Sequence, residues 1–148
     1  MPIYDGDIEA GEGIPPGAKA LKELARRHDG FAIASPEYNG SFPALLKNAI
    51  DWISRSEPGD RPLKVFRGKV AAILSASPGP GGGRRGLHQL RELLEGIAVS
   101  VIPPELAIAR SGEAPDAAGR LTRTEDLLGL EELAAALAKA AHKEEVAA

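Results

Sequence analysis

Cysteine is absent from this 148-residue chain, and aromatic residues make up only 4% of it. Without cysteine the protein can form no disulfide, no thiolate nucleophile and no cysteine-ligated metal site. Its apolar runs, such as residues 70–74, are far shorter than the roughly 20 residues that a membrane-spanning helix requires. The N-terminus also lacks the basic and apolar regions of a secretory signal. We therefore expect one globular domain, residues 1–148, in the cytoplasm and without membrane attachment.

Excess positive charge is lacking too. The chain has 18 Lys and Arg residues against 21 Asp and Glu, which gives a net charge of −3. Surfaces that bind nucleic acid carry stripes of basic residues, often with aromatic residues between them. Here the basic pairs Arg26-Arg27 and Arg84-Arg85 are far apart in the sequence. The composition therefore argues against nucleic acid as a partner.

Familiar catalytic signatures are also missing. Ser77 is not part of a Gly-x-Ser-x-Gly motif, and His28, His88 and His142 show no metal-ligand spacing. Glu37 is the only carboxylate in the candidate loops described below, so a pair of acid and base carboxylates is not supported. We assign no catalytic residue and no metal ligand. That absence is typical of enzymes in which a cofactor carries the chemistry.

Three short apolar runs predict buried strands at residues 31–35, 69–77 and 98–102. Each run is continuous in hydrophobicity instead of alternating, which is typical of a parallel sheet covered on both faces. Pro103-Pro104 is predicted to lie in an exposed loop.

Amphipathic segments alternate with these runs and predict helices at residues 17–28, 41–54 and 84–95, and from Thr122 onward. Ser41 is a plausible N-cap, and Thr122 to Glu125 form a capping-box pattern. The apolar face expected for the last helix is Leu127, Leu130, Ala134, Leu137 and Ala141. Helices and strands in this order favour an α/β fold, a doubly wound parallel sheet with helices on both faces.

Two loops follow predicted strands, where ligands bind in open α/β sheets. The first is Ser35-Pro36-Glu37-Tyr38-Asn39-Gly40-Ser41. Its Asn-Gly pair favours a turn with positive φ. The loop could offer backbone amides to a polar heterocycle while the tyrosine supplies an aromatic wall. A plain turn is the alternative, and the loop chemistry alone favours that alternative.

The second loop, residues 75–83, is rich in glycine and precedes the helix that begins at Arg84-Arg85. Glycine lets the backbone approach a ligand closely, and a helix N-terminus attracts anions or carbonyl oxygens. The Gly-Lys-Ser/Thr ending of a nucleotide-binding P-loop is absent. A flexible linker explains this segment equally well. Two such loops at successive strand ends nevertheless support a ligand site better than either one alone.

The first loop, continued by Leu45-Leu46-Lys47-Asn48-Ala49-Ile50-Asp51-Trp52, closely resembles the signature of the NAD(P)H-dependent FMN reductases. This family includes quinone, chromate and azo reductases with a flavodoxin-like fold. The glycine segment, residues 77–83, resembles the second flavin loop of the family. Pro103-Pro104-Glu105-Leu106 resembles its final strand region.

This resemblance implies a homodimer or homotetramer that binds one FMN per subunit, with the helix of Asp51 and Trp52 at the subunit interface. Hydride would pass from NADPH or NADH to FMN, and electrons would then pass to a quinone, a flavin or a similar small acceptor. One side of the flavin ring would be lined by Pro36, Glu37, Tyr38, Asn39 and Gly40, and the other side by Ser77, Gly79 and Gly82.

One part of the family pattern is not matched. Members begin with a strand, a Gly-Ser-x-Arg-x-x-Ser loop that binds the FMN phosphate, a helix and a second strand, whereas residues 3–7 here resemble the stretch after all of these. Loss of three hydrogen bonds to phosphate, at about 1.5–3 kcal/mol each, would weaken FMN binding by roughly a thousand- to a million-fold. Arg84 and Arg85 could compensate in part, although they adjoin the other loop.

The same difference would expose a strand edge. In the flavodoxin strand order the missing first strand is central, so residues 31–35 would form an unpaired apolar edge. The alternative prediction is therefore an N-terminally truncated, non-catalytic module that associates with a partner chain.

Overall fold

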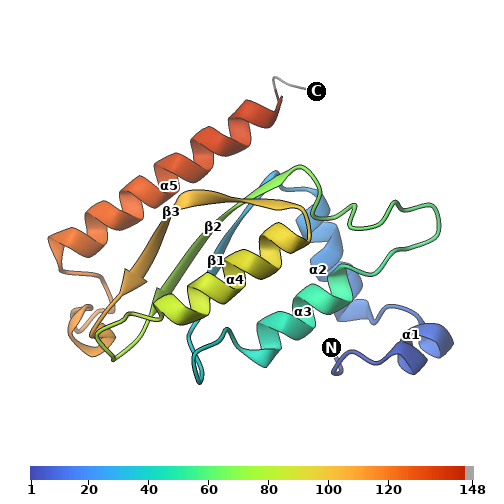
Figure 1. The fold of residues 1–148 in the computed structure, drawn as a ribbon, viewed down its shortest axis with the longest axis horizontal. Helices are drawn as coiled ribbons and strands as arrows, with labels where there is room; N and C mark the ends of the chain where they lie inside the picture. The colour runs from blue at the N-terminus through green and yellow to red at the C-terminus, as the bar shows by residue number, and fades with distance from the viewer. Residues whose placement is uncertain (146–148) are drawn as a thin grey trace.

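Three parallel strands lie at the centre of this computed structural model, which describes residues 1–145 (Figure 1). The elements in chain order are α1 (Gly6–Glu12), α2 (Pro16–Arg26), β1 (Gly30–Ala34), α3 (Ala44–Ile53), β2 (Lys69–Ala76), α4 (Arg84–Gly96), β3 (Val99–Ile108), the short 3-10 helix η1 (Ser111–Glu113) and α5 (Thr124–Glu145). This alternation confirms the predicted α/β class.

The sheet has the order β1-β2-β3, and both pairings are parallel. Phe31 lies opposite Ala71, and Leu74 lies opposite Leu106. All three strands consequently end at the same edge of the sheet, where the loops of interest begin. The first two strands lie within one residue of their predicted bounds.

The third strand is longer than predicted, and the prediction that Pro103-Pro104 forms a loop was wrong. Ala71 pairs with Val101 whereas Ile73 pairs with Glu105, so the register shifts between them. The strand bulges at this shift, and a proline there does not have to donate a ladder hydrogen bond. β3 also lies at the edge of this sheet. Edge position and bulge together explain why two prolines are tolerated inside a strand.

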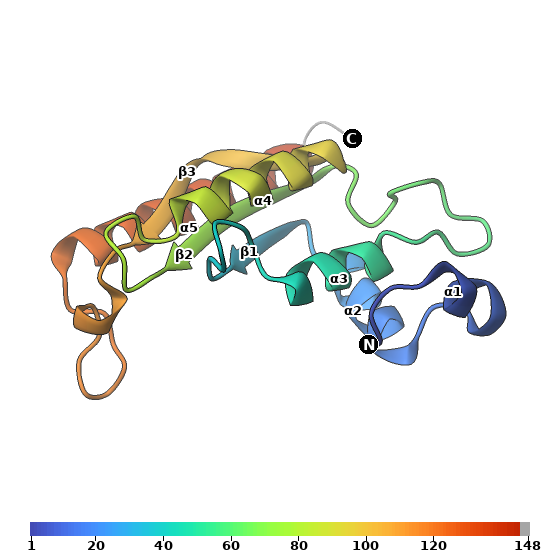
Figure 2. The same ribbon diagram turned by 60° about the horizontal axis from the view of Figure 1, so that its bottom comes forward.

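Helices cover both faces of the sheet (Figure 2). On one face, Ala71 and Ile73 of β2 pack in a cluster that includes apolar residues of α2, α3 and α4. On the other face, Ala72 packs in a separate cluster with Leu133 of α5. The alternate residues of β2 therefore serve two cores, which is the arrangement expected for a doubly wound sheet.

Two of the predicted helix starts were wrong. α3 begins at Ala44 with Pro43 as its N-cap residue, because the backbone of Ser41 is engaged in a bridge with Tyr38. α5 begins at Thr124, and the hydroxyl of Thr122 donates to the carbonyl of Ala114 instead of capping the helix. In both cases a partner outside the helix engages the residue that the local pattern favoured as a cap.

The apolar face of α5 was also only partly correct. Leu133, which was not on the predicted face, is buried, and Ala136, Leu137 and Ala140 pack beside it. Other predicted members of the face stay exposed: Leu127 is 42% and Leu130 is 38% accessible. Leu130 lines an open hollow together with residues of β1 and β2.

The outer edge of β1 is unpaired within residues 1–145, as expected. Ala32 and Ala34 are exposed, and an apolar hollow lies on each side of the strand. The first has a volume of about 320 Å³ and includes Leu21 and Leu24 of α2. The second, of about 610 Å³, is lined on the opposite side by residues of α5, among them Leu130.

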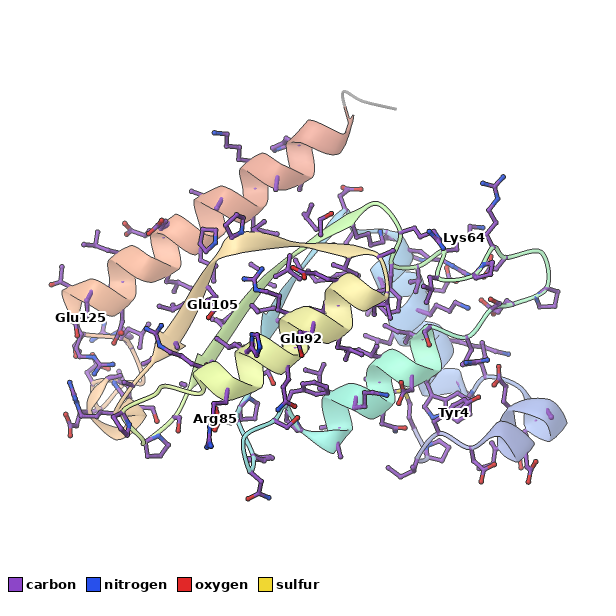
Figure 3. The ribbon with its side chains drawn as sticks, viewed as in Figure 1. Tyr4, Lys64, Arg85, Glu92, Glu105 and Glu125 are labelled. Carbon is purple, nitrogen blue, oxygen red and sulfur yellow. The ribbon has the colours of Figure 1, made fainter. Side chains whose placement is uncertain are left out.

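The N-terminal segment packs over the end of α3. The indole nitrogen of Trp52 donates to the carbonyl of Pro2 at 2.9 Å, and its ring meets that of Tyr4 edge to face at 5.0 Å (Figure 3). Asn48 also donates to Pro2 and accepts from the amide of Tyr4. Trp52 is completely buried by these contacts, so its side chain can reach neither a cofactor nor a partner subunit.

A group of ion pairs connects α2 to the segment between α3 and β2. Lys22, only 2% exposed, lies 3.2 Å from Glu57 and 3.6 Å from Asp60. Arg26 pairs with the same two carboxylates, and Lys64 lies 3.1 Å from Asp60. The hydrogen bond from Lys64 is the main cause that lowers the pKa of Asp60 from 3.8 to about 2, with help from the Glu57 amide and the charge of Arg26.

These ion pairs predict an acid-labile contribution to stability. Because the pKa of Asp60 is lower in the folded chain, its stabilising effect is present above pH 4 and is lost as the pH falls towards 2. Asp60→Asn should lower the thermal midpoint at pH 7 and reduce its fall between pH 4 and pH 2. The matched control is Asp7→Asn, since Asp7 is exposed and has no ion pair with the side chains of residues 1–142. An equal acid response in both variants would contradict the prediction.

Candidate functional site

The two predicted ligand loops lie together at the carboxyl edge of the sheet (Figure 1). We call residues 35–41 the first loop and residues 77–83 the glycine loop. The backbone amide of Ser35 continues the pairing of β1 by donating to the carbonyl of Leu74. The backbone amide of Ser77 donates to the carbonyl of Ile108. The strand ladder therefore fixes the point at which each loop leaves the sheet.

A tight turn shapes the first loop. Tyr38 and Ser41 exchange two backbone hydrogen bonds of 2.8 and 3.1 Å, and Asn39 and Gly40 between them have φ values of 53° and 84°. This confirms the predicted positive-φ turn, for which asparagine and glycine are the preferred residues. The turn points the ring of Tyr38 outward, where it is 64% exposed.

The glycine loop contains glycines of two kinds. Gly82 and Gly83 have positive φ, and a Cβ would lie 2.7 Å from the Ala107 backbone at Gly82 and 2.7 Å from the Ser75 hydroxyl at Gly83. The fold itself therefore requires these two. At Gly79 a Cβ would meet only Ser77, at 3.8 Å, and at Gly81 it would meet nothing within 4 Å. The fold does not require glycine at these two positions, whose open side suits close approach by a ligand.

Glu37 joins the first loop to the start of α4. One carboxylate oxygen accepts from Arg85, which is labelled in Figure 3, at 2.9 and 3.2 Å. The other accepts from the backbone amide of Gly86 at 3.1 Å. The Gly86 amide, followed by Arg85, lowers the pKa of Glu37. Glu37 is therefore an ionised clamp between the loops and has no proton to give at neutral pH.

Most of the predicted flavin-binding residues line two adjoining hollows. The larger part of the glycine loop, together with Glu37, lines a hollow of about 380 Å³. It contains the predicted residues Glu37, Ser77, Gly79 and Gly82. Asn39 and Gly40 line the second, of about 550 Å³, and Arg84 and Arg85 belong to both. Pro36 and Tyr38 are exposed nearby and line neither of these two hollows.

Free backbone donors make this site suitable for a flat polar ring. The amides of Asn39, Gly40 and Gly81 donate to no acceptor among the described residues. Asn39 and Gly40 line one of the two hollows, and Gly81 lines the other. The carbonyl and ring nitrogen atoms of an isoalloxazine would satisfy such donors. The residues present therefore fit a flavin ring.

Three contacts of the site were missed in the sequence analysis: the clamp from Arg85 and the Gly86 amide to Glu37, and the bond of 2.6 Å from the Ser75 hydroxyl to the Gly82 carbonyl. A signal for the first did exist. Positive side chains at a helix N-terminus are unfavourable beside the macrodipole. The Arg84-Arg85 pair there called for an acidic partner, and Glu37 was the only carboxylate in the loops.

The described part of the chain contains neither a metal site nor a membrane-spanning helix. No group of three His, Asp or Glu side chains within residues 1–142 is placed to hold a metal ion. No helix in that part is both long and apolar enough to cross a membrane.

Residues 1–113 match the family described as NADPH-dependent FMN reductase. The chain belongs to this family. An NAD(P)H-dependent FMN reductase of Pseudomonas aeruginosa is 43% identical over 122 residues, which are 82% of this chain and 63% of that protein. A quinone reductase of Escherichia coli is 46% identical over 94 residues, 64% of this chain and 47% of that protein. The chain thus spans about half to two thirds of the length of these relatives.

The solved structures agree with the FMN reductase family. FerB, a flavoenzyme NAD(P)H:(acceptor) oxidoreductase of Paracoccus denitrificans, superposes with a TM-score of 0.83 at 29% identity. The superposition covers 97% of this chain and 76% of that one. The predicted family and the predicted flavodoxin-like fold are both confirmed.

The two kinds of glycine should respond differently to substitution. Gly82→Ala forces a positive φ on a side chain that also clashes with β3, so it should lower the free energy of unfolding by about 1–3 kcal/mol. The Cβ of Gly79→Ala would make only an ordinary contact with Ser77, at 3.8 Å, so this variant should change the free energy of unfolding by less than about 0.5 kcal/mol. Urea unfolding of the two variants measures both values. Equal destabilisation would show that the distinction between these glycines is mistaken.

Proposed function

We propose that this chain is an NAD(P)H-dependent FMN oxidoreductase that passes electrons to a quinone, a flavin or a similar small acceptor. The observation that carries the proposal is the pair of strand-end loops, which Glu37 connects and whose residues with unused amides line two adjoining hollows. Membership of the FMN reductase family supports the same conclusion.

In this proposal FMN lies between the loops, and the bound flavin supplies hydride and electron transfer. Pro36, Glu37, Tyr38, Asn39 and Gly40 line one side of its ring, and Ser77, Gly79 and Gly82 line the other. The free amides of Asn39 and Gly40 donate to the polar edge of the ring. The exposed ring of Tyr38 covers an apolar part of it and limits access by water.

The protein supplies orientation and charge to the reaction, and no proton. Glu37 stays ionised because Gly86 and Arg85 stabilise its charge. Its charge is matched by the Arg85 guanidinium, so the clamp adds little net field beside the ring. Protons required by the acceptor therefore come from solvent, which reaches the open hollows.

We further propose a homodimer or homotetramer in the cytoplasm, where NADPH and NADH are available. α3 can contribute to the subunit interface through Leu45, which is 77% exposed, and through Asp51. Trp52 cannot contribute, because it is buried within its own chain.

A second candidate function is a non-catalytic module that associates with a partner chain. One observation favours it: the unpaired edge of β1 lies between two apolar hollows and carries no charged side chain over Gly30–Ala34. An unprotected edge of this kind is a template for pairing with another strand.

Flavin binding tests the first proposal. The purified 148-residue protein, incubated with excess FMN and desalted, should be yellow, should melt at a higher temperature than the untreated protein and should oxidise NADPH when a quinone is present. Protein that remains colourless, with an unchanged thermal midpoint in saturating FMN, would refute the proposal for this chain.

A substitution at Tyr38 tests whether the flavin binds at the first loop. Tyr38→Ala removes an exposed ring and should leave folding intact, while FMN affinity falls about tenfold or more through lost stacking. Leu128→Ala is the matched control, since that side chain is 59% exposed on α5 and lines neither of the two hollows. Fluorescence titration of FMN gives both affinities, and equal values would argue against a stacking role for Tyr38.

The second candidate makes a separate prediction. Flavin-free protein should associate at micromolar concentration in sedimentation experiments, and Ala32→Glu, which places a charge on the open edge of β1, should abolish the association. Ala135→Glu puts the same charge on an exposed position of α5 and should not. A stable monomer in the unmodified protein would count decisively against this candidate.

A further inference from the structure

The turn of the first loop lacks the support that such a turn has in a hairpin. It is formed by Asn39-Gly40, and two-residue turns with positive φ at both positions normally join two paired strands. Here the pairing of Tyr38 with Ser41 is a single isolated bridge. The next pair of ladder hydrogen bonds would fall to Pro36 and Pro43, which have no amide hydrogen to donate. The turn therefore depends on support from outside the loop.

Helix α4 supplies that support through Gln89. The side-chain nitrogen of Gln89 donates to the carbonyl of Gly40 at 3.0 Å, and its side-chain oxygen accepts from the hydroxyl of Ser41 at 2.6 Å. Four residues earlier on the same helix, the guanidinium carbon of Arg85 would lie 3.6 Å from a Cβ placed on Gly40. Residues four apart lie on one face of a helix, so a single face of α4 contacts the buried Gly40 at two points.

Only a carboxamide side chain can make both of these bonds. The carbonyl of Gly40 can only accept, so the atom that faces it must be the amide nitrogen, and the amide oxygen then faces the hydroxyl of Ser41. The amide of Ser41 in turn donates to the carbonyl of Tyr38. The peptide group between Gly40 and Ser41 is thus fixed at both ends, while the amides of Asn39 and Gly40 have no acceptor in the described chain.

We propose that Gln89 is a positioning residue for the flavin, which holds the Asn39-Gly40 turn in the shape that presents its two free amides to the ring. This inference rests on the proposed oxidoreductase function and assigns to α4 the preparation of the first loop. Gln89 acts through the turn, since its amide nitrogen and oxygen are both bonded to it. A turn that is ordered before the ligand arrives reduces the entropy that binding has to offset.

Hydrogen exchange tests the turn without flavin. In Gln89→Ala the amide hydrogens of Tyr38 and Ser41, which close the turn, should exchange about threefold to thirtyfold faster. The amides of β2 and the thermal midpoint should stay unchanged. Glu95→Ala is the matched control, because Glu95 is 52% exposed near the end of the same helix and lines neither hollow. Unchanged exchange at the turn would overturn the inference, and so would an equal acceleration in β2, which would assign Gln89 to general stability.

Flavin binding provides the second test. The affinity for FMN should fall about threefold to thirtyfold in Gln89→Ala, at least as far in Gln89→Glu, and not at all in Glu95→Ala. A carboxyl group at position 89 can donate to the Gly40 carbonyl only when it is protonated. The affinity of Gln89→Glu relative to the unmodified protein should therefore recover as the pH falls from 7 to about 4.5, near the free glutamate pKa of about 4.3. That of Gln89→Ala should not recover.

The outcomes separate this inference from the proposed function. An unmodified protein that binds no FMN overturns both. An unmodified protein that binds FMN overturns only the inference if Gln89→Ala binds it equally tightly, or if acid restores no affinity to Gln89→Glu.

Discussion

One carboxylate holds the candidate site together. Glu37 leaves the first loop after β1 and accepts hydrogen bonds from the side chain of Arg85 and the backbone of Gly86 in α4. It thereby sets the distance between two loops that come from different strands, and it stabilises the N-terminus of the helix that the glycine loop enters. The close fit at Gly86, where a Cβ would lie 3.3 Å from the Glu37 side chain, shows how little freedom this connection leaves.

The local sequence was sufficient for features that depend on local chemistry. The continuous apolar strands, the positive-φ turn at Asn39-Gly40 and the position of both loops after strands were all predictable, because hydrophobic runs and Asn-Gly pairs act over a few residues. Features that depend on residues distant in the sequence could not be predicted. Thr122 was expected to cap α5, yet it bonds to Ala114, and Leu133 is buried because of where the sheet lies, which periodicity cannot show. The Glu37 clamp spans 48 residues and belongs to the same class.

The glycine loop contains glycines that packing requires and glycines that packing does not require. Gly82 and Gly83 are needed so that the chain can pass under the backbone of β3 and the hydroxyl of Ser75. Gly79 and Gly81 meet no such constraint, and the amide of Gly81 is left without an acceptor in the described chain. In this chain both kinds of glycine stand in one short segment, so the run of glycines alone could not separate packing from ligand access.

The two margins of the sheet differ in a way that limits how copies of this chain can combine. On β3, Pro103 and Pro104 remove two consecutive amide donors at the bulge, which discourages another strand from adding there. β1 has no such protection. Another strand can therefore extend the sheet only at the β1 edge. When two copies pair their β1 edges across a twofold axis, neither copy keeps an unpaired β1 edge. Such an isologous contact closes on itself, so this fold does not offer the head-to-tail route by which strand edges build filaments.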